Sequence, residues 1–128
     1  YAIFTVFDVE KAEKLPQIRK QAIETYLKNL PEQPVFAVLF GSTAKENYTE
    51  ESDIDILLVT NSKIETKHAE KEADVLHSVK ISTFQMTYDA FVLELKLRED
   101  KVIQSAVCTG YPLINHVLYY EALNHERI

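Results

Sequence analysis

Two short apolar runs separated by an acidic pair constrain this chain more than any other feature of its sequence. The first run covers residues 35–40 and ends at Gly41-Ser42; ten residues later, Asp53-Ile54-Asp55 opens the second run. Short runs rich in β-branched and aromatic residues, bounded by proline and glycine, are typical of buried strands. The sequence therefore predicts a Gly-Ser pair at the end of one strand and two carboxylates at the start of the next.

The acidic pair is predicted to leave the second strand on one face. Side chains two positions apart in a strand are separated by roughly 6.6 Å, at a rise of about 3.3 Å per residue. Two carboxylates placed in this way raise each other's pKa unless a cation lies between them. Asp53 and Asp55 are therefore candidate ligands of a divalent metal. The alternative is a solvated strand start, which the nearby Glu50 and Glu51 would also suit.

Gly41 and Ser42 are candidates for binding a phosphate. Glycine lets the backbone approach a ligand closely because it has no Cβ, Ser42 offers a hydroxyl, and a helix beginning here would direct free N–H groups at an anion. Mg²⁺ takes oxygen ligands and commonly shares them with substrate phosphates. We therefore expect Mg²⁺, or Mn²⁺ in its place, on Asp53 and Asp55, facing the phosphates of a nucleotide. The alternative for Gly41 is a simple strand end.

The overall composition excludes several classes of protein. The chain has 128 residues, with 14 basic and 20 acidic side chains and a formal net charge of −6. A duplex-binding protein normally shows a basic patch instead. One cysteine allows no internal disulfide, and the four histidines lack metal-type spacing. No run is long enough to cross a membrane and no signal peptide is evident, so the expected location is the cytoplasm.

Hydrophobic periodicity predicts the remaining elements. Apolar residues recur at helical spacing from Ile18 to Leu30, with Pro16 in the first turn. The further predictions are a short helix over 43–47, a surface helix within 63–77, a strand over 79–86, a helix over 88–98 capped by Thr87, helices over 101–108 and 117–125, and an extended piece at 112–114. This order indicates an α/β (α+β) domain with a small mixed sheet and flanking helices.

The chain begins with an apolar segment, Tyr1 to Phe7. We expect it to form a strand, and we assign residues 1–14 to an N-terminal strand and linker and residues 15–128 to the main domain. A strand this apolar needs a partner on at least one face. Two partners are equally compatible with the sequence: a missing upstream domain, or a second copy of the chain in a homodimer.

The central motif resembles the signature of the DNA polymerase β nucleotidyltransferase superfamily, and its context is similar to the minimal nucleotidyltransferases of prokaryotes and archaea. The resemblance rests on G-S, ten residues and D-I-D, embedded in L-F-G-S-T-A-K and S-D-I-D-I-L-L-V, about a fifth of the chain. It implies a nucleotidyltransferase fold. It also implies that Gly41 and Ser42 bind nucleotide phosphates and that Asp53 and Asp55 are catalytic and bind metal. Lys45 stands where many relatives carry an arginine that reaches a phosphate; a surface lysine is the alternative.

The sequence departs from this family at one position that matters for catalysis. Members carry a third carboxylate on a later strand, where it often acts as the base for the attacking hydroxyl. Residues 79–86 contain no acid, and the polar candidates Ser82 and Gln85 are neither good bases nor strong Mg²⁺ ligands. Three interpretations follow: nucleotide binding without efficient transfer, a third group from elsewhere in the chain, or a misplaced strand.

The expected function is Mg²⁺-dependent transfer of a nucleoside monophosphate from a nucleoside triphosphate to a hydroxyl group. The resemblance makes a protein tyrosine or a small molecule such as an aminoglycoside the acceptor, and a small helical toxin-like protein the partner. One alternative is a nucleotide-binding regulatory module whose upstream domain acts on DNA. Another is an antitoxin-like protein that neutralises a partner through its first strand and last helix.

Overall fold

The computed structural model describes residues 2–127, with backbone only for residues 125–127. The elements in chain order are α1 (Ala2–Glu13), α2 (Gln17–Lys28), β1 (Phe36–Phe40), α3 (Gly41–Ala44), β2 (Ile54–Thr60), α4 (Lys67–His77), β3 (Ile81–Thr87), α5 (Tyr88–Leu97), α6 (Lys101–Thr109), β4 (Tyr111–Ile114) and α7 (His116–Arg127). This is the mixed α/β arrangement expected from the sequence. Every predicted element from residue 15 onward has a counterpart, but the short helix predicted over 43–47 begins two residues earlier, at Gly41, and ends at Ala44.

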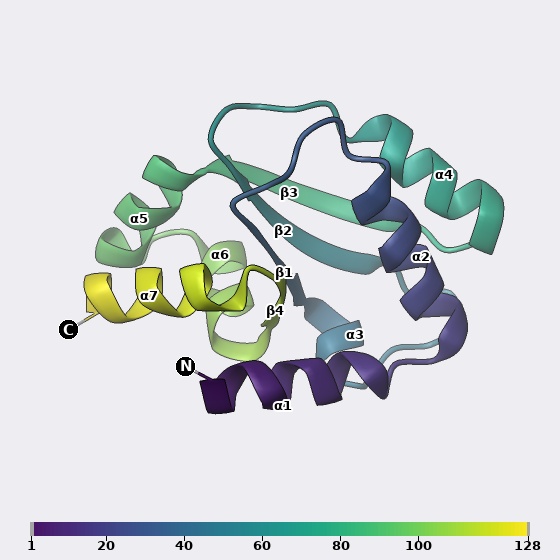
Figure 1. Cartoon of the computed structure of the whole chain (residues 1–128), viewed down its shortest axis with the longest axis horizontal. Coiled ribbons are helices and arrows are strands. Elements are labelled where there is room, and N and C mark those ends of the chain that lie inside the picture. Colours follow the sequence, from purple (N-terminus) through teal and green to yellow (C-terminus); the bar gives the residue numbers. More distant parts are fainter. Residues whose placement is uncertain (1, 128) are drawn as a thin grey trace.

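One mixed four-stranded sheet organises the chain, in the order β3-β2-β1-β4 (Figure 1). β1 pairs antiparallel with both β2 and β4, and β2 pairs in parallel with β3. The parallel pair is joined by a crossover through α4, as parallel strands require. The consequence for the site is that the end of β1 and the beginnings of β2 and β3 meet at the same edge of the sheet.

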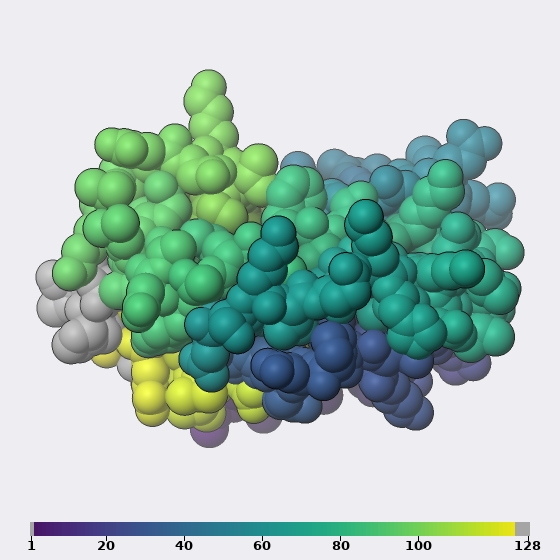
Figure 2. Space-filling model, turned by 90° about the horizontal axis from the view of Figure 1, so that it is seen from above, coloured from purple at the N-terminus to yellow at the C-terminus, as the bar shows by residue number. Residues whose placement is uncertain are grey.

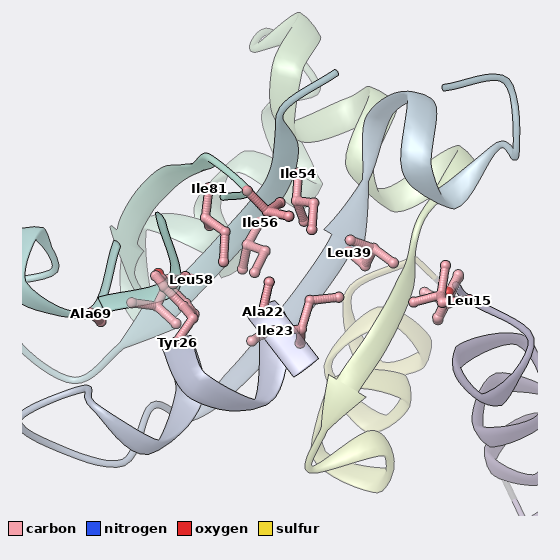
Figure 3. Packing of buried hydrophobic residues seen from close by; sticks show 14 of the residues in the cluster. Leu15, Ala22, Ile23, Tyr26, Leu39, Ile54, Ile56, Leu58, Ala69 and Ile81 are labelled. Atoms are coloured by element: carbon pink, nitrogen blue, oxygen red, sulfur yellow. The ribbon is translucent and has the colours of Figure 1, made fainter. Parts of the chain in front are cut away.

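Helices cover both faces of the sheet. α2 and α4 pack on one face, where Ile54, Ile56 and Leu58 of β2 point (Figure 3). Leu57 and Val59 point to the other face, which α5, α6 and α7 cover. Because β2 is buried on both faces it reads as a continuous apolar run, and fully burying each such side chain stabilises the fold by about 1.5–3 kcal/mol.

Local chemistry sets several of the helix boundaries. Pro16 is the N-cap of α2, directly before the first turn in which it was expected, and its fixed φ of −54° suits that position. Thr87 caps α5 as predicted, because its hydroxyl accepts the Ala90 N–H at 3.2 Å. Gly110 ends α6 in an extended conformation; a Cβ there would lie 2.4 Å from the Leu39 carbonyl oxygen. Gly110 therefore lets β4 approach β1 closely.

The predicted N-terminal strand is wrong, because residues 2–13 form the helix α1. A strand would need a partner for its backbone groups, whereas a helix satisfies them internally. α1 is held by the side chains of α7 and β4: the Tyr120 hydroxyl donates to buried Asp8 at 2.5 Å, and Lys11 lies 5.5 Å above the Tyr111 ring. A homodimer that pairs through a first strand is therefore not possible with this structure. The boundary predicted between residues 1–14 and the main domain stays a prediction.

The burial pattern of α1 is the reverse of that of an ordinary amphipathic helix. Asp8 is its one buried residue, whereas five large apolar side chains are exposed: Ile3, Phe4, Val6, Phe7 and Val9. The exposed fraction is 68% for Ile3 and 54% for Phe7. Among the described residues, no helix is long and apolar enough to cross a membrane.

Candidate functional site

Gly41 lies directly against the carboxylate of Asp55. The antiparallel pairing of β1 and β2 sets Phe40 opposite Asp55, and Gly41 follows with a positive φ of 73°. A Cβ on Gly41 would lie 2.2 Å from Asp55 Oδ2, so a larger residue there would displace the Asp55 carboxylate. The predicted phosphate-binding pair and the predicted metal-binding pair are therefore brought together by the register of two strands.

The two aspartates and Ser82 share one side of the sheet. Parallel pairing sets Asp55 beside Ser82, and the Ser82 hydroxyl donates to Asp53 Oδ2 at 3.1 Å. Burial, and then the negative charge of Asp53, raise the pKa of the Asp55 carboxyl above its ordinary value. Two carboxylates with uncompensated charge, one of them partly desolvated, are suited to binding a cation.

β3 supplies the hydroxyl of Ser82 but no third carboxylate. Gln85, the other polar candidate, points to the opposite face. There its Oε1 accepts the backbone N–H of Ile64 at 2.7 Å, and its Nε2 donates to the Ile64 carbonyl oxygen at 2.9 Å. Phe84 is on the same side as the aspartates but contacts the Phe40 ring. Among residues 2–124, whose side chains are described, no cluster of three or more His, Cys, Asp or Glu could hold a metal. The strand covers residues 81–87, where 79–86 was predicted, and neither range contains an acidic residue, so a misplaced strand does not explain the missing acid.

Ser42 and Lys45 take different positions around the same turn. Ser42 is half-buried in α3, and its carbonyl oxygen accepts the Asn47 N–H at 3.1 Å. Lys45 is exposed immediately after α3, and its backbone N–H bonds the Gly41 carbonyl at 3.1 Å. Lys45 therefore stands one turn from the Gly-Ser pair with its side chain in solvent.

Arg19 holds the loop that joins the two halves of the site, a role that the sequence alone does not indicate. Its guanidinium donates to Thr43 Oγ1 at 3.0 Å and to the carbonyl oxygens of Thr49 at 2.8 Å and Ser52 at 3.0 Å. It also lies 4.4 Å from the centre of the Tyr48 ring. Only 4% of Arg19 is exposed. The one available signal is a charged residue next to the apolar face of α2, where burial requires partners.

Comparison with known families identifies this arrangement. The sequence profile of the family described as "Polymerase beta, Nucleotidyltransferase" matches residues 21–116, three quarters of the chain. The chain belongs to this family. The match includes Gly41-Ser42, both aspartates and Ser82, so the candidate site lies inside the nucleotidyltransferase domain.

Comparison with solved structures shows the same fold. One structure, described as "Crystal structure of the toxin-antitoxin with AMP-PNP", contains a chain that is 14% identical. It superimposes with a TM-score of 0.55 over 84% of this chain and 86% of that chain. No match was found among curated proteins. At this identity the likeness concerns the fold alone.

The residues of this nucleotidyltransferase domain fit a divalent cation that shares its ligands with a substrate. Asp53 and Asp55 supply hard oxygen donors, and the space kept free by Gly41 adjoins Asp55 Oδ2. Two carboxylates leave most positions of an octahedral cation to water and phosphate oxygens, which is how Mg²⁺ is commonly bound in enzymes that use nucleotides.

Proposed function

We propose that the chain transfers a nucleoside monophosphate from a nucleoside triphosphate to a hydroxyl group. The observation that supports the proposal is the closeness of Gly41 to Asp55, because it brings the proposed phosphate-binding turn beside the proposed metal ligand. In this proposal Gly41 and Ser42 bind the phosphates, Lys45 reaches them from solvent, and Asp53 and Asp55 hold Mg²⁺ or Mn²⁺.

The reaction forms a bond between the acceptor oxygen and the α-phosphorus and breaks the bond from that phosphorus to the bridging oxygen. Pyrophosphate leaves and the hydroxyl proton passes to solvent water. The bound cation would neutralise charge that develops on the phosphate oxygens. The backbone at Gly41-Ser42 orients the donor, and the Ser82 hydroxyl holds Asp53 in place.

Nucleotide labelling tests this proposal. The protein is incubated with Mg²⁺, each of labelled ATP, GTP, CTP and UTP, and candidate hydroxyl acceptors. We expect Asp53→Asn/Asp55→Asn to abolish labelling, while Glu50→Gln/Glu51→Gln, which removes the same charge from the adjacent exposed loop, leaves it unchanged. Equal labelling by the double aspartate variant would exclude the proposed chemistry.

A second function is a nucleotide-binding module with weak transfer. It is supported by Ser82, which pairs with Asp55 on the strand where the resemblance implies a third carboxylate and which cannot act as a strong base. Calorimetry would then show Mg²⁺-dependent nucleotide binding without turnover. We expect Ser82→Asp to raise the transfer rate in that case, with Ser62→Asp in the exposed loop after β2 as the control. A wild-type chain with rapid turnover would refute this second function.

We also propose a protein partner. The exposed apolar side chains of α1 give a surface that such a partner could cover. The structural neighbour described as a toxin-antitoxin with AMP-PNP supports a nucleotide and a protein partner for this chain, and we propose a small helical toxin-like protein as that partner. Light scattering after size exclusion, with and without the candidate partner, tests whether a complex forms.

A further inference from the structure

A hollow opens beside the candidate site at the start of β3. Its volume is about 380 Å³, and its lining includes Asp53 and Ser82 from the site together with Lys67, Lys71 and Lys80. Lys67 and Lys71 are one helical turn apart on α4, and Lys80 directly precedes β3. We refer to this space as the lysine hollow. It lies beside α4, at the end of the molecule opposite to α5 and α6 (Figure 2).

The three lysine side chains have no partner among the described residues. None of the three takes part in an ion pair with a residue whose side chain is described; the ion pair of Lys20 with Glu13 lies outside the hollow. No side-chain hydrogen bond of Lys67, Lys71 or Lys80 is present in the described part of the chain. In a chain with a net charge of −6, three unpaired ammonium groups around one space are available to bind an anion.

Two further acidic residues, Glu70 and Asp74, also line the lysine hollow, so its three lysines stand against two carboxylates besides Asp53. Glu70 Oε2 accepts the Thr66 hydroxyl at 2.8 Å. Asp74 remains at the rim. Once a cation neutralises Asp53, the balance in the hollow favours a negative ligand.

The lysine hollow and the Gly-Ser turn lie on opposite sides of the two aspartates, because β2 lies between β1 and β3 in the sheet. Gly41 contacts Asp55 from β1, whereas Ser82 contacts Asp53 from β3. In phosphoryl and nucleotidyl transfer the attacking and leaving oxygens lie roughly in line on opposite sides of the phosphorus. With the donor phosphates on the β1 side, the attacking hydroxyl must approach from the β3 side.

From this geometry we infer that the acceptor enters through the lysine hollow and carries a phosphate group near its reactive hydroxyl; the inference rests on the proposed transferase function. The three lysines attract a phosphate and repel a polycationic acceptor such as an aminoglycoside. The small side chain of Ser82 leaves room that a larger carboxylate would fill. A small phosphorylated alcohol and the end of a nucleic acid share this chemistry.

A binding experiment with a filled donor site tests the inference. The protein is first saturated with Mg²⁺ and a non-hydrolysable ATP analogue, and the amide shifts of α4 are then followed during titration with glycerol 3-phosphate, with uncharged glycerol, or with a 5′-phosphorylated dinucleotide. We expect both phosphorylated probes, but not glycerol, to shift the α4 resonances. The stronger of the two identifies the source of the phosphate.

Matched lysine variants separate this site from the donor site. Lys67→Gln/Lys71→Gln/Lys80→Gln should weaken binding of both phosphorylated probes at least tenfold, while affinity for the ATP analogue changes less than twofold. The charge-matched control, Lys14→Gln/Lys28→Gln/Lys101→Gln, removes three exposed lysines elsewhere and should leave probe binding unchanged.

Two results would overturn the inference. One is equal binding of glycerol and glycerol 3-phosphate. The other is a triple variant that still binds the probes, or that loses the ATP analogue and the probes equally. Failure of the transferase function itself would appear differently, as equal nucleotide labelling by the parent chain and by Asp53→Asn/Asp55→Asn.

Discussion

Gly41 is the single residue on which the arrangement of the site depends most. Gly41→Ala places a Cβ 2.2 Å from Asp55 Oδ2 and forces a non-glycine residue into a left-handed conformation. The conformation alone costs about 1–2 kcal/mol, and relief of the contact must move the Asp55 carboxylate. We expect a lower urea midpoint and loss of Mg²⁺-dependent nucleotide binding in calorimetry.

Ser42→Ala provides the control for Gly41→Ala. It removes a hydroxyl without adding an atom near Asp55, so the urea midpoint should stay close to that of the parent chain. If Gly41→Ala binds Mg²⁺ and nucleotide as the parent does, the contact between the glycine and Asp55 has no part in the site.

Asp55 is expected to make stability depend on pH in an unusual direction. Burial, and then the charge of Asp53, raise the pKa of its carboxyl above the ordinary 3.8. The folded chain therefore holds this proton more tightly than the unfolded chain, so the contribution of Asp55 to stability is lost as the pH rises through the folded pKa. Asp55→Asn should raise the thermal midpoint at neutral pH and lose that advantage well below pH 4.

Added Mg²⁺ gives this pH prediction an independent check. The cation should raise the thermal midpoint of the parent chain at neutral pH and have little effect on Asp55→Asn. The exposed Asp89→Asn is the control and should behave as the parent does. A thermal midpoint of Asp55→Asn below that of the parent at neutral pH would contradict the argument.

Among the structural elements, the loop between α3 and β2 depends on Arg19 of α2. Arg19→Ala removes a buried guanidinium that serves three oxygen acceptors. Hydrogen bonds to charged groups contribute about 1.5–3 kcal/mol each, with incomplete additivity, so we expect a loss of about 2–4 kcal/mol in the free energy of unfolding. Hydrogen exchange should show reduced protection in residues 43–52.

The neighbouring Lys20 provides the control for Arg19. Its ion pair with Glu13 is at the surface, at 3.0 Å, and such pairs contribute about 1 kcal/mol or less. Lys20→Ala should therefore leave protection of the loop unchanged. Similar stability losses in Arg19→Ala and Lys20→Ala would show that the buried contacts do not hold the loop.

Elements with strong local signals were predictable from the sequence. Apolar runs and helical periodicity gave β1, β2 and α2, and Thr87 gave the start of α5. The first helix was missed because its apolar residues face solvent and its buried residue is Asp8, the reverse of the usual pattern. Only the partner Tyr120, 112 positions later, explains that reversal.

The candidate site was predictable where sequence spacing determines it. Gly41, Ser42, Asp53 and Asp55 lie on two consecutive strands, so their proximity follows from one hairpin-like pairing. The contacts of Ser82 and Arg19 depend on long-range packing, which no local pattern shows. The roles assigned to these residues remain predictions for the experiments above.

For the whole molecule, the exposed apolar face of α1 should determine association. Phe7→Lys replaces a side chain that is 54% exposed, so it should reduce concentration-dependent self-association, or binding of a partner, with little change in the thermal midpoint. Leu93→Lys changes an equally exposed residue on α5, 54% exposed, and should have no such effect. Light scattering at several concentrations measures the difference. Equal effects of both variants would show that the exposed face of α1 does not determine association.

The position of β4 has a consequence for the synthesis of the chain. β4 is the last strand in sequence, yet it pairs with the first, with Ala37 opposite Ile114. While the chain emerges from the ribosome, β1 and β2 can pair early, but the other edge of β1 stays open until residues 111–114 are available. During that interval the apolar β1 presents unpaired N–H and C=O groups, and such edges readily pair with other chains. Nascent chains halted before Tyr111 should therefore depend on chaperones far more than chains halted after Asn115.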